Sequence, residues 1–363
     1  MGYDYLIVGA GLFGSVFARE ATNKGYDCLV IDKRDHIGGN CYSERIDGID
    51  VHKYGPHIFH TNSKKIWDYV NQYSDFQQYQ HNVIANYHGE LYNLPFNLNT
   101  FYQIFNTCNK QEIIDRIEQT RFKGNPTNLE EYALSLVGEE IYQKLIYGYT
   151  KKQWNTEPSK LPKSIIARLP FRFRFDNNYY NAKYQGIPVN GYTKMFENLL
   201  DGIDLSLETD FFKQRSTFEK ISKKIVYTGP IDKLYGYQYG KLDYRSLEFK
   251  HYRLSQESYQ GCSQMNYTGL DKKYTRIIEH KWFRNLDTPN TVITKEFPAE
   301  YKDTLDPFYP INNDKNKQII NLYKKIISPQ YILGGRLAEY KYYDMDQVVA
   351  SSVDKSQKKF IID

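Results

Sequence analysis

The run GAGLFG at 9–14 restricts the fold of this 363-residue chain more than any other feature. It follows an apolar run at 3–8, which predicts a buried parallel strand, and it precedes a helical pattern at 15–24. In such a turn the first glycine permits a tight reversal, the second lets the backbone approach a pyrophosphate, and the third lets the helix pack closely on the strand. The sequence therefore predicts a dinucleotide-binding βαβ unit with the pyrophosphate at the helix N-terminus.

The second strand of this unit, predicted at 26–31, ends in an acidic residue. Asp32 follows the glycine run by about twenty residues, the spacing at which a carboxylate accepts a hydrogen bond from a ribose hydroxyl. The glycine pair Gly38-Gly39 comes shortly afterwards and is typical of FAD proteins, and the predicted strand at 225–230 ends in Thr-Gly-Pro, as in the same class. These features favour FAD, and NAD is the alternative that they leave open.

Charge and cysteine content exclude several classes of function. The chain has 48 basic and 43 acidic residues, a net charge of +5 without a long basic run, so we expect no nucleic-acid partner. The four cysteines form no CxxC pair and no Cys/His cluster with zinc spacing, so we expect free thiols and no metal site. The chain enters its first strand without a signal peptide and has no apolar run long enough for a membrane span, so we expect a cytoplasmic protein.

The periodicity of apolar residues changes along the chain. Helical spacing at 99–154, with Asn128 as N-cap and a break at Gly138, indicates a helical insert. Alternating patterns predict an antiparallel sheet with strands at 245–254, 262–268, 274–282 and 291–297. Other elements are predicted as helices at 63–73, at 316–327 and from 344 onward, a hairpin at 83–92, and a strand at 331–333.

We therefore predict an α/β multidomain fold, in which a Rossmann-type FAD-binding domain is interrupted by a helical insert and an antiparallel sheet domain. The predicted FAD-binding domain is discontinuous and comprises 1–80, 186–244 and 311–363. The helical insert, which carries a mobile substrate loop, spans 98–165, and the sheet domain comprises 81–97, 166–185 and 245–310.

Arginines stand out against the lysine-rich background, and the residues around them form motifs. The motifs include YGPHIFHT at 54–61, GYTKKQW at 148–154 and YTRIIEH at 274–280, with further segments at 93–96, 176–179, 184–188, 308–311 and 334–346. In this order and along almost the whole chain, they make the sequence similar to the bacterial UDP-galactopyranose mutase family.

The resemblance implies an isomerase that interconverts UDP-galactopyranose and UDP-galactofuranose with no net redox change. It implies that N5 of reduced FAD attacks the anomeric carbon, and that the sugar ring opens and recloses as a covalent adduct before UDP recaptures it. The implied partners are a UDP-sugar, an external reductant for the flavin and a second subunit in a homodimer. The product would supply galactofuranose for a cell-surface polysaccharide.

The resemblance also implies residue roles. Arg168 and Arg276 match the pair that clamps the diphosphate, and with His57 they are the implied catalytic residues. The implied substrate-binding residues are Asn82, Tyr149, Thr150, Trp154, Arg168, Tyr179, Arg276, Tyr309 and Tyr342. With the glycine motif included, the predicted cofactor-binding residues are Gly9, Gly11, Leu12, Phe13, Gly14, Asp32, Lys33, Gly39, Asn40, His57, His60, Gly229, Arg336, Tyr342, Asp344 and Met345.

The sequence departs from the family pattern beside the predicted substrate loop. Asn155 follows Trp154 where many members have glycine, and Leu145 and Ile146 stand where some members carry aromatics near uracil. Base packing would then depend more on Tyr149. Three alternatives stay open: a flavin oxidoreductase of the amine-oxidase or monooxygenase type, a UDP-sugar-binding flavoprotein without activity, and the same chemistry on UDP-N-acetylgalactosamine.

Overall fold

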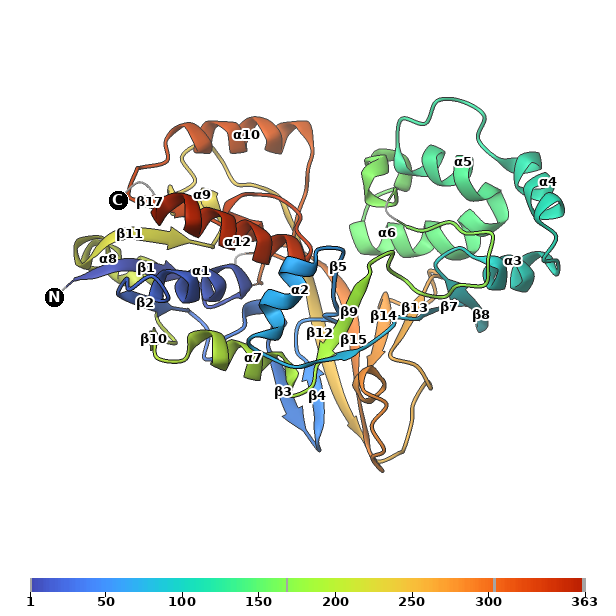
Figure 1. The fold of residues 1–363 in the computed structure, drawn as a ribbon. Coiled ribbons are helices and arrows are strands. Elements are labelled where there is room, and N and C mark those ends of the chain that lie inside the picture. The colour runs from blue at the N-terminus through green and yellow to red at the C-terminus, as the bar shows by residue number, and fades with distance from the viewer. Residues whose placement is uncertain (1, 168, 303–304, 361–363) are drawn as a thin grey trace.

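A parallel sheet forms the centre of the nucleotide-binding part of the computed structural model, which describes residues 2–167, 169–302 and 305–360 (Figure 1). The strand order is β10-β2-β1-β11-β17, and every neighbouring pair is parallel. The strands are β1 (Tyr3–Val8), β2 (Cys28–Ile31), β10 (Asp204–Ser206), β11 (Ser222–Tyr227) and β17 (Tyr331–Leu333). The predicted Rossmann-type core is therefore confirmed.

Helices cover both faces of this sheet, and alternate residues of β1 point into the two opposite layers. Tyr5 and Ile7 pack in the apolar cluster that contains residues of α1 (Leu12–Thr22). Leu6 packs on the other side, with Phe218 of α8 (Arg215–Ile221) and Leu234 of α9 (Ile231–Leu234). In Figure 1, α1 runs between α12 (Met345–Phe360) and α7 (Gly191–Leu200).

A second, seven-stranded sheet has the order β16-β12-β15-β14-β13-β7-β8. Its strands are β7 (Val83–Tyr87), β8 (Glu90–Leu94), β12 (Tyr244–Leu254), β13 (Gln264–Tyr267), β14 (Arg276–Glu279), β15 (Thr291–Glu300) and β16 (Tyr309–Pro310). All pairs are antiparallel except β13 with β7. The sheet is thus mixed rather than purely antiparallel, because the β7–β8 hairpin joins it through a parallel edge.

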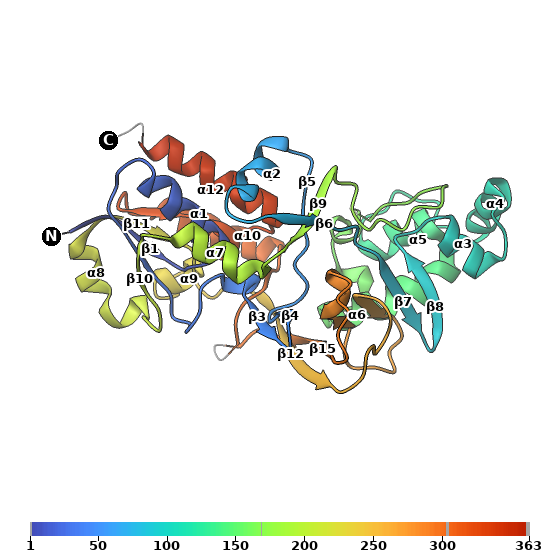
Figure 2. The same cartoon turned by 60° about the horizontal axis from the view of Figure 1, so that its bottom comes forward.

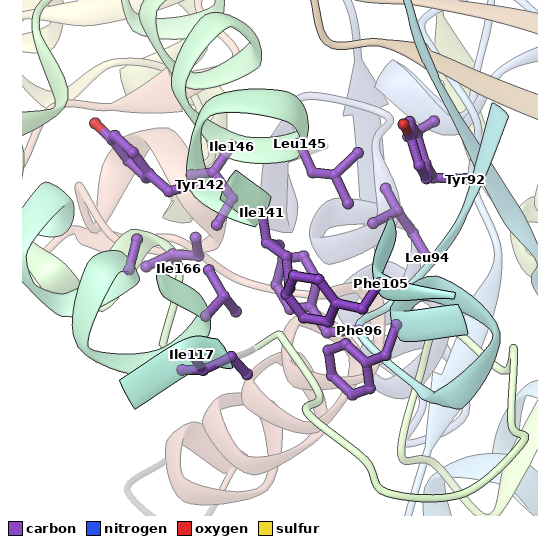
Figure 3. Close-up of a cluster of buried hydrophobic side chains, with 14 of the residues drawn as sticks. Tyr92, Leu94, Phe96, Phe105, Ile117, Ile141, Tyr142, Leu145, Ile146 and Ile166 are labelled. Carbon is purple, nitrogen blue, oxygen red and sulfur yellow. The ribbon is translucent and has the colours of Figure 1, made fainter. Parts of the chain in front are cut away.

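The helical insert consists of α3 (Leu98–Phe105), α4 (Lys110–Thr120), α5 (Leu129–Ile141), a π-helical segment (Tyr142–Tyr147) and α6 (Gly148–Trp154). Asn128 caps α5 as predicted, and its side chain accepts a hydrogen bond from Glu131 N at 3.0 Å. Gly138, at φ 71° and ψ 178°, breaks the helix. Figure 3 shows the apolar core that binds these helices to the β7–β8 hairpin, with Leu94, Phe105, Ile117 and Leu145 among its members.

Shorter elements connect these parts. They are β3 (Ser43–Ile46), β4 (Ile49–His52), β5 (Phe59–Thr61), α2 (Lys64–Asn71), β6 (Phe76–Gln78), β9 (Tyr184–Pro188), α10 (Asp314–Lys325) and α11 (Gly335–Ala338). In both Figure 1 and Figure 2, the second sheet lies between the parallel sheet and the helical insert. Within the described ranges, none of the helices is long and apolar enough to cross a bilayer.

Candidate active site

The glycine-rich turn between β1 and α1 is closely packed backbone. Gly9 has φ 112°, and a Cβ on Gly14 would lie 2.0 Å from the Gly9 carbonyl oxygen. A Cβ on Gly39 would lie 2.9 Å from Gly11 Cα, so the second glycine pair passes directly over the turn. The two glycine motifs therefore form one cradle in which backbone N–H groups can approach a pyrophosphate.

The predicted cofactor residues Leu12 and Phe13 contribute to this cradle through their backbone. Both side chains are buried, and the Phe13 ring packs against Gly334, where a Cβ would lie 2.0 Å from a ring carbon. Their N–H groups belong to the first turn of α1 and have no partner within the helix. The side chains thus fix α1 against the C-terminal segment, while the N–H groups remain available for an anion.

Asp32 stands at the carboxyl end of β2, as predicted. Its Oδ2 accepts a hydrogen bond from Ala10 N at 2.8 Å, and its Oδ1 accepts one from Arg34 N at 2.9 Å. A carboxylate has about four acceptor positions, so two remain for ribose hydroxyls. Asn40 Oδ1 accepts a bond from Arg34 Nη2 at 3.1 Å, whereas the exposed Lys33 forms an ion pair with Asp306.

The C-terminal segment returns to the same cradle. Cys41 Sγ, next to the second glycine pair, contacts Met345 Sδ at 3.7 Å. Asp344 immediately precedes α12, and its N–H donates to Gln347 Oε1 at 3.0 Å. The start of α12 therefore lies beside the Gly38–Gly39 turn. Gly229 follows β11 at the carboxyl end of the sheet, and a Cβ there would lie 2.6 Å from the Tyr227 hydroxyl.

A chain of histidines leads to the predicted flavin side. His57 Nδ1 donates to Gly55 O at 2.8 Å, and His57 N donates to His52 Nδ1 at 3.1 Å. His52 N donates in turn to His280 Nδ1 at 3.2 Å, and His280 Nε2 donates to Thr294 Oγ1 at 2.6 Å. Because a carbonyl or an N–H occupies each Nδ1, the tautomers are fixed, and the neutral His57 ring presents an unprotonated Nε2. Burial lowers the pKa of His57 to about 4.

Arg276 is the charge at the centre of the site. Its Nε donates to Glu296 Oε2 at 2.8 Å, and its Nη2 lies 2.7 Å from the same oxygen in an ion pair, from β14 to the facing residue of β15. Burial lowers the pKa of Arg276, but Glu296, Tyr149 and Tyr309 raise it by more, so the guanidinium stays charged. One carboxylate occupies one side of the guanidinium, and the remaining donors can bind a diphosphate.

Aromatic side chains surround this arginine. Burial raises the pKa of Tyr149, and Arg276 lowers it in part, so the two side chains are close. Tyr309 stacks on Tyr342 at 6.1 Å between ring centroids, with Arg336 over both rings at 5.5 and 5.0 Å. Arg336 also donates to the carbonyl oxygens of Phe308 and Tyr343. The predicted residues of the 309–342 region thus form one cluster.

The helix that carries Tyr149, Thr150 and Trp154 is fixed to the second sheet. A Cβ on Gly148 would lie 2.3 Å from Thr268 O, so α6 and the end of β13 are in close contact. Lys152 Nζ donates to Tyr267 O at 2.7 Å and to Tyr274 O at 3.1 Å. Burial lowers the pKa of Lys152 to about 8. Thr150 is buried, and Trp154 packs against the core of the helical insert.

The remaining predicted residues differ in their positions. Tyr179 N donates to His81 O, and the two rings meet edge to face at 5.6 Å. His60 stacks on Tyr180 at 3.8 Å. Asn82 is exposed, whereas His81 before it is buried. Arg168 lies outside the described residues, so its position beside Arg276 stays a prediction.

Four side chains at the site were not among the sequence predictions. Glu296 is paired with Arg276, Lys152 holds α6, Arg245 Nε donates to Gln153 O at 3.3 Å, and His81 lies next to Tyr179. A polar residue at every second position of a strand is the only sequence signal for Glu296, and many surface strands share it. The pairing itself depends on the register of β14 against β15.

The structure offers FAD the features that it requires. The glycine cradle admits a pyrophosphate, Asp32 can accept from a ribose, and Met345 at the start of α12 contacts Cys41 beside the cradle. Among the described residues, no group of three or more His, Cys, Asp or Glu side chains could hold a metal ion.

Comparison with known proteins identifies the family. The family model described as UDP-galactopyranose mutase matches residues 144–342, and one described as an NAD(P)-binding Rossmann-like domain matches residues 7–73. A probable UDP-galactopyranose mutase of Klebsiella pneumoniae is 40% identical over 99% of this chain and 94% of its own length. A dTDP-fucopyranose mutase of Escherichia coli is 38% identical over 97% of both chains.

Solved structures confirm the fold. A reduced UDP-galactopyranose mutase superposes with a TM-score of 0.77 at 14% sequence identity and covers 100% of this chain and 95% of its own. A putative protoporphyrinogen oxidase from Exiguobacterium reaches a TM-score of 0.65 at 14% sequence identity over 99% of both chains, so it is similar in fold. The family model covers more than half of the chain, and the relatives match it nearly from end to end. This chain therefore belongs to the UDP-galactopyranose mutase family and binds FAD.

Proposed function

We propose that this enzyme interconverts UDP-galactopyranose and UDP-galactofuranose at a reduced FAD. The observation that carries the proposal is the half-buried Arg276, which is paired with Glu296 and lies close to Tyr149 of α6 and to Tyr309. A cation held in this way suits the diphosphate of a nucleotide sugar, and the aromatic rings suit its base and sugar. The Klebsiella relative, 40% identical, is named for this reaction.

The side chains of this site would bind and orient the substrate. Arg276, with Arg168 as the predicted second arm, would hold the diphosphate and stabilise UDP as it leaves. Tyr149 would stack on the base. The hydroxyl groups of Tyr179, Tyr309 and Tyr342 would donate hydrogen bonds to phosphate oxygens. Trp154, Thr150 and Asn82 are proposed for the remaining contacts.

The cofactor residues would leave the flavin poised beside the sugar. The glycine cradle and Asp32 would hold the adenosine and pyrophosphate, and His57, His60, Arg336, Asp344 and Met345 would surround the isoalloxazine. Reduced FAD supplies the nucleophile that takes up the anomeric carbon. The positive end of α12 would favour the anionic reduced ring.

A second candidate is a dTDP-sugar, because the Escherichia coli dTDP-fucopyranose mutase is nearly as similar, at 38% identity. The residues that pack beside the base site do not decide between the two bases, since Leu145 and Ile146 are buried aliphatic side chains of the π-helical segment. UDP-N-acetylgalactosamine is a third substrate that the same chemistry would accept. All three share the diphosphate and the flavin.

An oxidoreductase function has less support than a mutase function. Pseudooxynicotine dehydrogenase and nicotine dehydrogenase match only 20% of this chain, at 31% and 30% identity. A match of 71 residues is too short to include both the glycine cradle and Arg276. The oxidases with similar folds therefore support the architecture and not the reaction.

A product assay tests the proposal. The dithionite-reduced protein is incubated without oxygen with UDP-galactofuranose, and the products are resolved by chromatography, with dTDP-fucofuranose and the N-acetyl analogue in parallel. We expect UDP-galactopyranose in the first incubation. Nucleotide binding without any isomerisation would instead make this a UDP-sugar-binding flavoprotein without activity.

The location, oligomeric state and reductant of the enzyme are also proposals. We propose a cytoplasmic homodimer that takes electrons from an external reductant and supplies galactofuranose for a cell-surface polysaccharide. The free thiols of Cys28, Cys41, Cys108 and Cys262 fit a reducing compartment. We also propose the three-part division, with FAD bound by 1–80, 186–244 and 311–363, a helical insert at 98–165, and a sheet domain of 81–97, 166–185 and 245–310.

A further inference from the structure

Arg34 joins the predicted cofactor site to a segment far along the chain. Its backbone N–H donates to Asp32 Oδ1 at 2.9 Å, and its Nη2 donates to Asn40 Oδ1 at 3.1 Å. The same Nη2 donates to Asp306 Oδ2 at 2.5 Å. One residue thus contacts the acid predicted to bind ribose, the turn of the second glycine pair, and a carboxylate 272 residues further along the chain.

Asp306 is the shared partner of two cations. Lys33 Nζ lies 2.8 Å from its Oδ1, and Arg34 bonds its Oδ2. Burial raises the pKa of Asp306, but Arg34 and Lys33 lower it by more, so the carboxylate is charged. The side chains of Arg34 and Asp306 are only 16% and 27% exposed, whereas Lys33 is largely exposed. Because water and salt screen an exposed pair more strongly, Arg34 contributes most of the attraction.

The backbone around Asp306 is bound to the second sheet. Asp306 O accepts from Ser246 Oγ at 2.7 Å, and Phe308 N donates to Arg245 O at 2.9 Å, so both partners belong to β12. The next residue is Tyr309, which faces Arg245 in the pairing of β16 with β12 and belongs to the predicted phosphate site. A shift of Asp306 would therefore move Tyr309.

Arg34 also contacts the loop that carries His57. Its Cζ lies over the Tyr54 ring, 4.5 Å from the ring centroid, in a cation–π contact. The Tyr54 ring in turn packs on the buried Phe308, with 6.5 Å between the ring centroids. Two routes thus lead from Arg34 to Phe308, one through the carboxylate of Asp306 and one through Tyr54.

We propose that Arg34 and Asp306 are positioning residues that couple the binding of FAD to the binding of the substrate. The proposal rests on the proposed function, since it assumes the FAD ribose at Asp32 and a nucleotide diphosphate beside Tyr309. When FAD orders the turn after β2, Arg34 is ordered with it, and the ion pair then holds Tyr309 in place for the phosphates. Linkage is reciprocal, so a bound nucleotide raises the affinity for FAD in turn.

Release of FAD from the holoenzyme, with and without UDP, measures this coupling. The FAD-loaded protein is diluted, and the free flavin is collected by ultrafiltration over time. We expect saturating UDP to slow the release about 10-fold in the parent and no more than about 3-fold in Asp306→Asn and Arg34→Met. Asp306→Asn keeps the shape of the side chain and removes only its charge. A general structural defect would speed the release equally with and without UDP, so a ratio equal to that of the parent in either variant would overturn the proposal.

A control and a double variant restrict the effect to this pair. Asp4 pairs with Lys223 at 2.7 Å and is similarly exposed, at 22%, but it lies at the start of β1, away from the glycine turn. Asp4→Asn should therefore keep the ratio of the parent. The double variant of Arg34→Met with Asp306→Asn should lower the ratio no further than either single change, because both remove the same contact. Multiplied effects in the double variant would overturn coupling through this pair.

Failure of the proposed function gives a different result. If the parent does not isomerise UDP-galactofuranose, the proposed function fails, and the FAD release ratio is then measured with dTDP in place of UDP. If the parent turns over UDP-galactofuranose and binds UDP in a calorimetric titration, but UDP leaves its FAD release unchanged, the coupling alone is overturned.

Discussion

Arg276 on β14 faces Glu296 on β15, and the Arg276 Nε donates a hydrogen bond to Glu296 Oε2 at 2.8 Å, while Nη2 lies 2.7 Å from the same oxygen. Glu296 is fully buried, and the arginine side chain keeps a limited exposure of 18%. The carboxylate therefore fixes the guanidinium on one side, and the remaining N–H groups of Arg276 can bind a substrate. Glu296 thus positions Arg276, and Arg276 is left to bind the substrate.

Substitution of Arg276 should lower the rate of catalysis, whereas loss of the Glu296 carboxylate should lower stability. We expect Arg276→Ala to lower kcat by about 10²-fold or more, because it removes a charge that stabilises the leaving UDP. Glu296→Gln should keep the fold but free the guanidinium to rotate, whereas Glu296→Ala should cost about 3 kcal/mol of unfolding free energy by leaving a buried charge unpaired. Rates and urea unfolding measure the two effects.

The matched control for this pair is Arg253, an exposed arginine of the same sheet that pairs with Asp47. Arg253→Ala should leave kcat and stability within experimental error, because exposed pairs contribute little. Near-normal turnover in both Arg276→Ala and Arg168→Ala would contradict the assignment of a diphosphate clamp.

FAD retention should depend on the contact between the two glycine motifs. In Gly39→Ala the new Cβ would lie 2.9 Å from Gly11 Cα, so the cradle would have to open. We expect the purified variant to retain little FAD, measured by absorbance at 450 nm (about the flavin maximum) against protein. Gly48 also has a positive φ, of 80°, but its Cβ would meet nothing within 4 Å. Gly48→Ala should thus share the backbone strain and keep its FAD.

Stability should fall in mildly acidic solution. Burial lowers the pKa of His52 and His81 to about 3 and that of His57 and His251 to about 4, from 6.5 in the unfolded chain. Between these values the unfolded chain binds more protons, so stability is full above pH 6.5 and is lost as pH falls towards 4.

Urea unfolding of the holoenzyme at fixed FAD, from pH 7 to about pH 4.5, measures this fall. Each buried histidine contributes about 1.4 kcal/mol per pH unit within its window, and carboxylates contribute only towards the acidic end. We expect the slope near pH 5 to be smaller by about that amount in His81→Asn. An unchanged slope would show that this imidazole is not held neutral.

Lys152 should make substrate binding sensitive to alkaline pH. Burial lowers its pKa to about 8, so the ammonium that bonds Tyr267 O and Tyr274 O loses its charge above that pH. We expect KM for the nucleotide sugar to rise above pH 8, because α6 with Tyr149 and Trp154 is held less firmly. In Lys152→Met, KM should already be raised at pH 7, by about 10-fold, and its rise with pH should disappear.

Lys151 is the neighbouring control, since its ion pair with Glu157 is largely exposed. Lys151→Met should keep the KM and its pH dependence. If KM rose equally in both lysine variants, α6 would be sensitive to any loss of charge. The specific role of the Lys152 bonds to Tyr267 O and Tyr274 O would then be wrong.

The nucleotide-binding part was predictable because its geometry is local. A glycine run between a strand and a helix leaves one way to fold, and Asp32 follows at the end of β2. The helix nevertheless begins at Leu12, earlier than the predicted 15, because apolar spacing identifies a helix better than its first turn.

The second sheet was predictable in its elements but not in its pairing. The strand predicted at 274–282 is shorter, since β14 ends at Glu279 before a helical turn, and the parallel contact of β7 with β13 has no local signal. Pairing across such sequence distances decides which side chains meet. Arg276 was predicted from its motif, whereas Glu296 entered the site only through the register of β14 against β15.

Counting turnovers after a single reduction tests the central claim most directly. The protein is reduced with two electrons per FAD, excess reductant is removed without oxygen, and UDP-galactofuranose is added while flavin absorbance and product are followed together. A mutase in which the flavin is a nucleophile predicts many molecules of UDP-galactopyranose per FAD with the flavin still reduced at the end. One product or none per flavin, with the flavin reoxidised, would contradict it and identify an oxidoreductase.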